Sequence, residues 1–219
     1  MKERPILFSA PMVKAILEGR KTQTRRVMKV QPTAHPSPPC NPQYNIDLNP
    51  FVWCAESGAP AGLLELCPFG KVGDELWVRE TFMPRLDLDE NDSPERRRHY
   101  TYYKASSPNA AKDDGHWHPY PMKWTPSIFM PRWASRIQLR ITAVRVERLQ
   151  DISEADAWAE GAPTDGKSSV PVEINAAGFG GGWNSARSWF ESIWSSINGA
   201  ESWAANPFVW FVEFERVKP

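Results

Sequence analysis

The part of the chain best suited to do chemistry is the basic run Gly-Arg-Lys-Thr-Gln-Thr-Arg-Arg at residues 19–26. Its residue types alternate as in a β-strand, where every second side chain shares a face. Lys21, in the turn before this strand, is then expected close to the hydroxyl of Thr24. An amine beside a hydroxyl, with guanidinium groups around them, can activate a weak nucleophile or bind an anion. The alternative interpretation is a solvated basic patch made of Arg20, Lys21, Arg25 and Arg26.

A short helix is expected directly before this run and should position it. Residues 11–18 are amphipathic, Ser9 stands at the expected N-cap and Pro11 in the first turn, and Gly19 is placed to end the helix in the left-handed conformation. The apolar residues 6–8 before it predict a first strand. Within the basic strand we expect Arg26 on the same face as Thr24.

The pattern Gly-x-Lys-x-x-Thr-x-Arg, formed by Gly19, Lys21, Thr24 and Arg26, resembles the signature of the ASCH family. Many members of that family carry Glu at the position of Thr24. In the small ASCH enzymes similar to bacterial N4-acetylcytidine amidohydrolase, the position is Thr. This one residue therefore carries the resemblance to the deacylase branch.

Three further segments resemble the family in order. Residues 73–78 look like its Gly-Asp turn leading into a barrel strand, residues 149–161 like its second short helix, and residues 208–217 like its closing strand. The resemblance implies one PUA-like domain over residues 1–219. Its long insertions would lie at about 28–68, 84–127 and 162–183, as in the longer ASCH proteins of phage and prophage regions.

The resemblance also implies an activity and its residues. Thr24 would be the nucleophile, Lys21 its base or electrostatic activator, and Glu160, at the matching end of the second short helix, the proton shuttle. The expected reaction is metal-independent and needs no cofactor: it removes an acyl group from the exocyclic amine of a modified nucleoside or base, as in an N4-acylcytidine. The expected substrate-binding residues are Arg20, Arg26, Arg79 and Arg132.

Other functions of the same site stay open. The chain is alternatively a non-catalytic PUA-like binder of RNA or modified nucleic acid, an ASCH-type ribonuclease, or an accessory protein with a vestigial pocket. A single cleft lined by Arg79, Arg132 and Arg136 would favour the binder or the nuclease. The expected partner is a modified nucleoside or base, with single-stranded RNA as the second candidate.

Composition limits these choices. Over 219 residues, 26 basic and 26 acidic side chains give a formal net charge of +0, which argues against a face that holds a long nucleic acid by its phosphates. The 21 prolines and 11 tryptophans favour fixed irregular loops with aromatic anchors. The start of the chain has no apolar run of signal-peptide length and no segment is long enough to span a membrane, so we expect a cytoplasmic protein.

The three cysteines, Cys40, Cys54 and Cys67, with His35 nearby, raise the question of a metal. They lack the close Cys-x-x-Cys pairing that makes a zinc site recognisable, so we expect reduced thiols and no metal.

The remaining patterns predict an α+β chain built on a small, mostly antiparallel barrel with short flanking helices and long proline- and tryptophan-rich insertions. Residues 75–82 are expected to form one strand. From Ile137 to Val146 the apolar residues alternate and then change phase at Val144, which predicts a bulge or bend. Ser153 and Asp156 form a capping-box-like helix start.

Near the C-terminus, residues 178–182, rich in glycine, are expected to form a lid or turn. Asn184 or Ser185 should cap a helix that ends at Asn198-Gly199. Residues 208–217 should form a central strand covered on both faces.

Overall fold

The computed structural model describes residues 1–31, 33–34, 52–53, 61–84, 93, 101–110, 123–163 and 185–217. The hypotheses on His35, Cys40, Cys54 and the glycine-rich segment 178–182 lie outside the described residues, as does most of each expected insertion. Within the described residues, no helix is long and apolar enough to cross a membrane.

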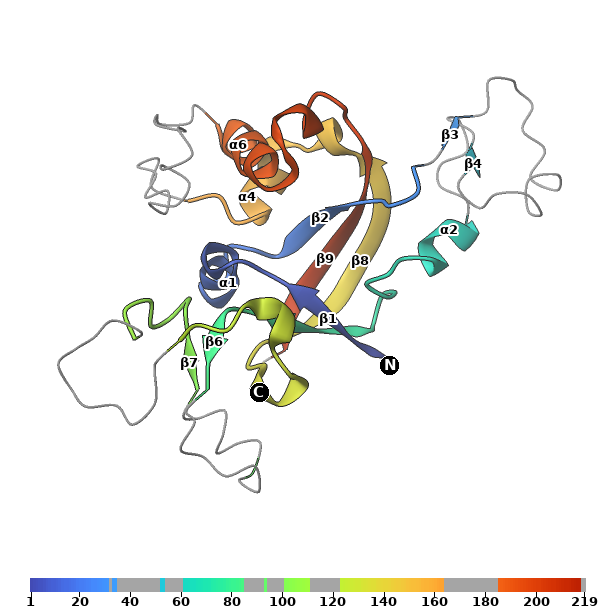
Figure 1. The fold of residues 1–219 in the computed structure, drawn as a ribbon. Coiled ribbons are helices and arrows are strands. Elements are labelled where there is room, and N and C mark those ends of the chain that lie inside the picture. The colour runs from blue at the N-terminus through green and yellow to red at the C-terminus, as the bar shows by residue number, and fades with distance from the viewer. Residues whose placement is uncertain are drawn as a thin grey trace.

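A curved five-stranded sheet forms the centre of the molecule, in the order β1-β5-β8-β9-β2 (Figure 1). β1 (Glu3–Leu7) and β5 (Glu75–Arg79) run parallel, and the other neighbours are antiparallel: β8 (Gln138–Arg148), β9 (Phe208–Val217) and β2 (Gln23–Val27). The sheet is mixed but mostly antiparallel and few helices accompany it, which confirms the predicted α+β class.

The prediction of a closed barrel is wrong, because the sheet stays open. β1 and β2 are its two edges, and no backbone pairing joins them among the described residues. The helix α1 (Ala10–Leu17) connects these edges, and its buried Val13 and Ile16 enter the core beside them. The helix α1 therefore covers the inner face beside β1 and β2, whereas in a closed barrel these two edge strands would pair with each other.

The termini of α1 largely follow the prediction. Ser9 is the N-cap, although its side chain makes no capping hydrogen bond, and Pro11 lies in the first turn. Glu18 is the C-cap and Gly19 has φ +75°, the left-handed conformation expected of it.

The phase change in β8 is a bulge, as predicted. The register between β8 and β9 shifts between Ile141 and Ala143, so that Val144 and Val146 return to the face of the sheet that carries Leu139 and Ile141. β9 is an interior strand, and its first five residues are all buried, which confirms a strand covered on both faces.

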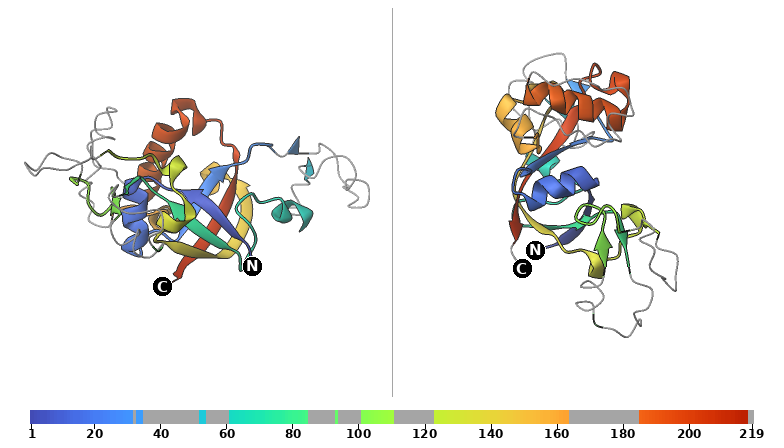
Figure 2. Two further views of the ribbon diagram at one scale, coloured as in Figure 1. Left: turned by 60° about the horizontal axis from the view of Figure 1, so that its bottom comes forward. Right: turned by 90° about the vertical axis from the view of Figure 1, so that its left-hand side faces the viewer.

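The two faces of the sheet carry different cores. The inner face packs against α1 and α2 (Ala61–Glu65) and includes Ile6, Phe8, Leu76, Val212 and Phe214. At one end of the other face, α4 (Glu154–Ala159) and α6 (Ala186–Asn198) lie together, as Figure 2 shows. Their core is formed by Leu149, Ile152, Ala157, Ala162, Ala186, Phe190, Trp194 and Val209.

The starts of these helices are also as predicted. Ser153 and Asp156 form a reciprocal capping box at α4. Ser185 is the N-cap of α6, in a box with Ser188, and Gly199 with φ +98° follows its last residue.

The predicted strand 75–82 is shorter than expected. β5 ends at Arg79, and Phe82 belongs to β6 (Phe82–Met83) because it pairs with Tyr103 of β7 (Tyr102–Tyr103) and exchanges hydrogen bonds with Thr125. The remaining described elements are β3 (Thr33–Ala34), β4 (Val52–Trp53) and the 3₁₀ turns Ser127–Phe129, Arg132–Ala134, Leu149–Asp151 and Ala200–Ser202.

Candidate active site

The start of β2 lies directly against the end of α4. Lys21 and Glu160 form an antiparallel backbone bridge, and the Thr22 amide donates to the Ala159 carbonyl at 2.9 Å. Gly161 allows this approach: it has φ +104°, and a Cβ there would stand 3.0 Å from the Ala15 Cβ and 3.2 Å from the Lys21 Cβ. Only glycine fits both the backbone conformation and the space.

Lys21 and Glu160 meet as a buried ion pair. The Lys21 Nζ donates to Glu160 Oε2 at 2.6 Å and to the Glu160 carbonyl at 2.9 Å. The exposed fractions of the two side chains are 0% and 4%. Burial lowers the pKa of the Lys21 amine. The positive charges of Arg26 and Arg25 lower it further, and the negative charge of Glu160 opposes the shift.

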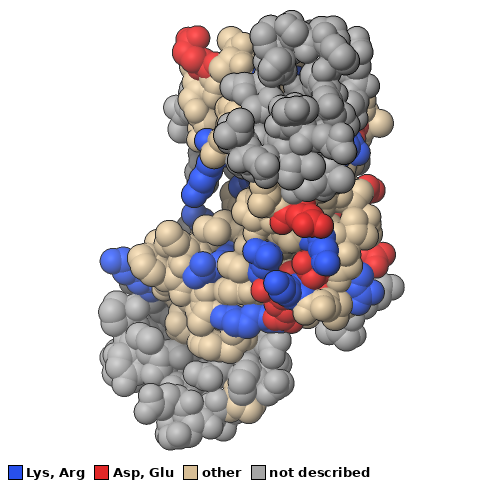
Figure 3. Space-filling view, turned by 90° about the vertical axis from the view of Figure 1, so that its right-hand side faces the viewer, with Lys and Arg blue, Asp and Glu red and all other residues tan. Residues whose placement is uncertain are grey.

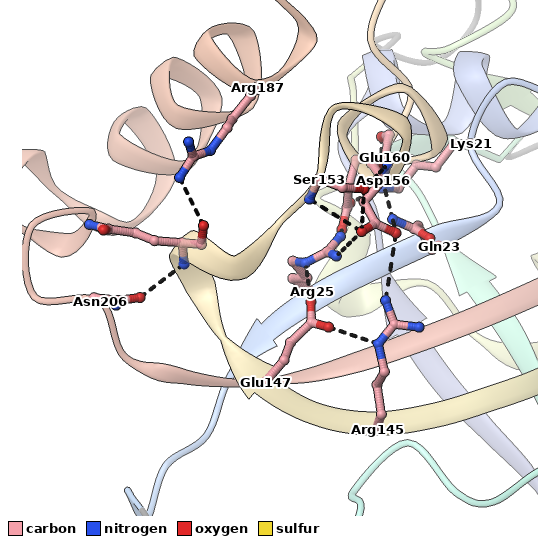
Figure 4. A network of polar contacts seen from close by, with 11 residues as sticks. Lys21, Gln23, Arg25, Arg145, Glu147, Ser153, Asp156, Glu160, Arg187 and Asn206 are labelled. Atoms are coloured by element: carbon pink, nitrogen blue, oxygen red, sulfur yellow. Dashed lines mark hydrogen bonds and ion pairs between the residues drawn. The ribbon is translucent and has the colours of Figure 1, made fainter.

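Arg25 is the centre of a larger buried network (Figure 4). Its Nη1 donates to Glu160 Oε1 at 3.1 Å, its Nε donates to Glu147 Oε1 at 2.6 Å, and its Nη2 lies 3.4 Å from Asp156 Oδ2. The Arg25 side chain is 0% exposed. A solvated patch is therefore the wrong interpretation for Lys21 and Arg25.

Aromatic rings enclose the same guanidinium. The Arg25 Cζ lies 5.0 Å from the ring centroid of Phe211 and 5.9 Å from that of Phe190. Phe211 is the strand partner of Arg25 on β9, and Phe190 comes from α6. Cation–π attraction and the three carboxylates offset part of the hydration that Arg25 loses, and its buried Nη2 has no hydrogen-bond partner among the described residues.

The carboxylates around Arg25 have further donors. Arg145 donates from Nε to Glu147 Oε2 at 2.7 Å and lies 3.6 Å from Asp156. Ser153 and the Gln23 amide donate to Asp156. Burial acts to raise the pKa of Asp156, but these hydrogen bonds and the charge of Arg25 outweigh it and the pKa is lowered. The network thus holds three cations, Lys21, Arg25 and Arg145, and three carboxylates, Glu147, Asp156 and Glu160.

Thr24 lies on the other face of β2. Its strand partner is Val212 in the inner core, and it is 3% exposed. No hydrogen bond in the described part of the chain joins the Thr24 hydroxyl to Lys21 or to Glu160. The structure therefore brings Lys21 and Glu160 together and places Thr24 in β2, three residues after Lys21, on the face that carries the inner core.

Arg26 shares the face of Thr24, as expected from the alternation. Its Nη2 donates to the Leu7 carbonyl at 2.6 Å, which links the two edge strands of the sheet. The Arg26 Cζ and the Lys21 Nζ lie 5.3 Å and 5.6 Å from the centroid of the same Phe8 ring. The Arg26 Nε is buried without a hydrogen-bond partner.

The other three arginines expected to bind substrate have contacts with the protein. Arg20 donates from Nη1 to the carbonyls of Gly161 and Ala162, at 2.7 and 3.2 Å, and pairs with Glu18. These bonds tie the segment after α4 to the turn before β2. Arg20 therefore lies beside the Lys21–Glu160 pair.

Arg79 and Arg132 lie near one another and contact neither Lys21 nor Glu160. Arg79 donates to the carbonyls of Met130 and Ile128, and Arg132 forms a two-pronged pair with Glu3 at 2.8 and 3.1 Å. Both guanidinium groups stack on Trp77, at 5.3 and 5.9 Å from its ring centroid. Figure 3 shows basic and acidic side chains beside one another on one face of the molecule, not separated by sign.

A second buried ion pair was not anticipated from the sequence. Arg136 holds Glu80 through two hydrogen bonds, from Nε at 2.8 Å and from Nη2 at 3.0 Å, and stacks 4.0 Å from the Tyr103 ring centroid. Burial raises the pKa of Glu80, although Arg136 opposes this. One sequence signal was present: Glu80 continues the alternation of the buried Leu76 and Val78, which points to an inward position.

Of the three cysteines, Cys67 is described. It is buried in the inner core, and burial raises the pKa of its thiol against backbone hydrogen bonds from Phe69 and Gly70. No cluster of three or more His, Cys, Asp or Glu side chains that could hold a metal is found among the described residues.

Comparisons with protein-family models, with curated proteins and with solved structures find no match to this chain.

Proposed function

We propose that this chain is an ASCH-type amidohydrolase that removes an acyl group from the exocyclic amine of a modified nucleoside or base. Lys21, Thr24 and Glu160 are its catalytic residues in this proposal. Its fold is a variant of the PUA-like architecture in which the sheet stays open.

The observation that carries the proposal is the buried contact between Lys21 and Glu160. The Nζ–Oε2 distance is 2.6 Å, and the amine has a lowered pKa because it is buried and has two guanidinium groups nearby. A lysine whose pKa is lowered has a larger neutral fraction near pH 7 than an exposed lysine, so more of it is able to accept a proton. Residues 139 positions apart in the sequence form this contact.

The chemistry follows from these three groups. Neutral Lys21 takes the proton of the Thr24 hydroxyl, and the Thr24 oxygen forms a bond to the acyl carbonyl carbon. Glu160 passes the proton from Lys21 to the leaving nitrogen as the amide C–N bond breaks, which releases the nucleoside with a free amine. Water then attacks the acyl-Thr24 ester, releases the carboxylic acid and restores the hydroxyl.

Substrate must also alter this arrangement. Lys21 is fully shielded and the Thr24 hydroxyl is not hydrogen-bonded to it. Binding therefore has to loosen the contact between the start of β2 and the end of α4 and bring Thr24 toward the amine. α4 has six residues. Its end is held to the segment before β2 by a backbone bridge and one backbone hydrogen bond, and side-chain hydrogen bonds from Arg20, Gln23 and Arg25 add to them.

The motif residues support the family part of the proposal. Gly19, the glycine of the signature, has the left-handed conformation. Gly73 has φ +88°, and the next residue, Asp74, accepts hydrogen bonds from the backbone amides of Lys2 and Lys71. The link from Arg26 to Leu7 brings the two sheet edges together where a barrel would close.

The nucleic-acid binder is less well supported. Arg79 and Arg132 are engaged by carbonyls and by Glu3 and lie away from the Lys21–Glu160 pair. Phosphate binding would have to break these contacts, and the net charge of +0 supplies no general attraction.

The test is a panel of acylated cytidines and adenosines incubated with the purified protein, with release of the free nucleoside or base followed by chromatography. Thr24→Val keeps the shape of the side chain and removes the hydroxyl, so turnover should fall by at least about a thousandfold while substrate affinity stays within about tenfold. Thr24→Ser is the matched control, because it restores a hydroxyl and should retain part of the rate.

Wild-type protein that hydrolyses no member of the panel, yet binds an oligonucleotide with a steep salt dependence, would contradict the amidohydrolase and support the binder.

A further inference from the structure

We propose that Arg25 is a positioning residue of the Lys21–Glu160 site, whose guanidinium holds one carboxylate oxygen of Glu160 so that the other faces Lys21. In its catalytic part this inference rests on the proposed hydrolase. The ASCH signature leaves this position unspecified, so the role is read from the contacts of this chain.

The geometry divides the two oxygens of Glu160 between two cations. Oε1 accepts from Arg25 Nη1 at 3.1 Å, and Oε2 accepts from Lys21 Nζ at 2.6 Å. A carboxylate at the end of a short helix has several rotamers, and a contact to each oxygen selects one of them. The rotamer that Arg25 selects is the one that places Oε2 on the amine.

Arg25 can do this because it is itself fixed. Glu147 accepts from its Nε at 2.6 Å, Asp156 lies beside its Nη2 at 3.4 Å, and the rings of Phe211 and Phe190 lie near its Cζ. β8 and α4 supply the carboxylates, and β9 and α6 supply the rings. Four elements thus fix the position of the guanidinium, and its hydrogen bond to Oε1 in turn fixes the Glu160 carboxylate.

The charges facing Lys21 give the inference a measurable consequence. They are Glu160 on the α4 end and Arg25 and Arg26 on β2, with the Phe8 ring after β1. Glu160 raises the pKa of Lys21, and both arginines lower it. Loss of the Arg25 charge removes a cation that repels the protonated amine. It also leaves Lys21 as the cation that Glu160 contacts, and both changes raise the pKa of the Lys21 amine.

The experiment replaces Arg25 with Gln and follows the Lys21 side chain by NMR in protein labelled with ¹³C-lysine. The Lys21 signal is assigned by its loss in Lys21→Arg. In Arg25→Gln the titration midpoint of Lys21 should move to higher pH by about half a pH unit or more. With an acylated nucleoside, kcat should fall about tenfold with KM within about twofold, and the pH profile should move with the Lys21 midpoint.

Arg145→Gln is the matched control. Arg145 belongs to the same network and contacts Glu147 and Asp156, but it makes no contact with Glu160. It should lower the melting temperature and leave the Lys21 midpoint and the pH profile unchanged. If Arg145→Gln moves the midpoint as far as Arg25→Gln does, the effect belongs to the network as a whole and the positioning role is wrong.

Arg25→Lys keeps the test decisive if Arg25→Gln does not fold. Lysine keeps the charge but lacks the planar fork that reaches Glu147 and Glu160 together. We expect kcat to fall in this variant also, and full wild-type kcat together with a wild-type Lys21 midpoint would overturn the inference. The titration needs no substrate, so an inactive wild-type protein would contradict the proposed hydrolase while the Lys21 midpoints still decide the role of Arg25.

Discussion

Two groups of buried charges differ in how many donors serve each carboxylate. Beside α4, Asp156 receives hydrogen bonds from Ser153 and Gln23 and lies near two arginines. Beside β6 and β7, Glu80 has Arg136 as its one cationic partner in the described structure. Burial disfavours the charged form of both carboxylates, yet the pKa of Asp156 is lowered and that of Glu80 is raised.

The difference shows that the pKa of a carboxylate depends on its burial together with the donors that it receives. Several donors outweigh the desolvation cost at Asp156, whose side chain is 24% exposed, whereas one guanidinium does not outweigh the larger cost at Glu80, which is 2% exposed. The donors that serve Asp156 belong to the network that also contains the Lys21–Glu160 pair.

The largest expected effect is on stability and comes from breaking the network at Glu160. Glu160→Gln leaves Lys21 and Arg25 buried with one carboxylate fewer, so we expect a loss of about 3–5 kcal/mol in the free energy of unfolding. Glu80→Gln should cost only about 1 kcal/mol, because the Arg136 side chain is 24% exposed and can turn to water. Urea denaturation of both variants gives the comparison, and equal losses would show that donor number is not what separates the two groups.

A second effect, of intermediate size, is an opposite dependence on pH. The folded-state pKa of Asp156 is lowered, so its stabilising contribution is present above about pH 3.9 and is lost as pH falls through the folded value. The folded-state pKa of Glu80 is raised, so its contribution is complete below about pH 4.3 and is lost as pH rises through the folded value.

This comparison is measured by denaturation of wild type, Asp156→Asn and Glu80→Gln between pH 3 and 7. As the pH falls, wild type should lose its advantage over Asp156→Asn and gain stability relative to Glu80→Gln. Differences of the same sign for the two variants would contradict the assigned directions.

The smallest effect is expected at an exposed pair built from the same residue types. Glu3 and Arg132 form two hydrogen bonds, which lower the pKa of Glu3, but their side chains are 45% and 41% exposed. Glu3→Gln should cost less than about 1 kcal/mol, and added salt should reduce that cost further. The cost of Glu160→Gln should hardly respond to salt, because water and ions do not reach it.

Local signals in the sequence were sufficient for many single elements. The Ser153–Asp156 capping box, the left-handed Gly19 and the bulge after Ile141 each depend on residues close in the sequence, and each is found. The Lys21–Glu160 contact came from the family resemblance and not from any local rule.

Long-range features were the ones that sequence reasoning missed. Nothing in a basic run marks Arg25 as buried, because its partners Glu147, Asp156 and Glu160 lie more than a hundred residues away. The prediction of a closed barrel was wrong for a similar reason. Whether the edges β1 and β2 pair depends on where α1 packs between them, which alternation within each strand does not encode.

The strand order also has a consequence for how the chain folds. β1 pairs with β5, and β2 with β9, so Glu3 meets Glu75 and Gln23 meets Glu213. In the five-stranded sheet only the neighbours β8 and β9 follow one another in the sequence, and residues 149–207 separate them. Every pairing in it must close a long loop, and such high contact order places folding in the slow range of about milliseconds to seconds. During that interval the apolar β9 is without partners, which makes refolding at low protein concentration and moderate temperature the favourable route to folded protein.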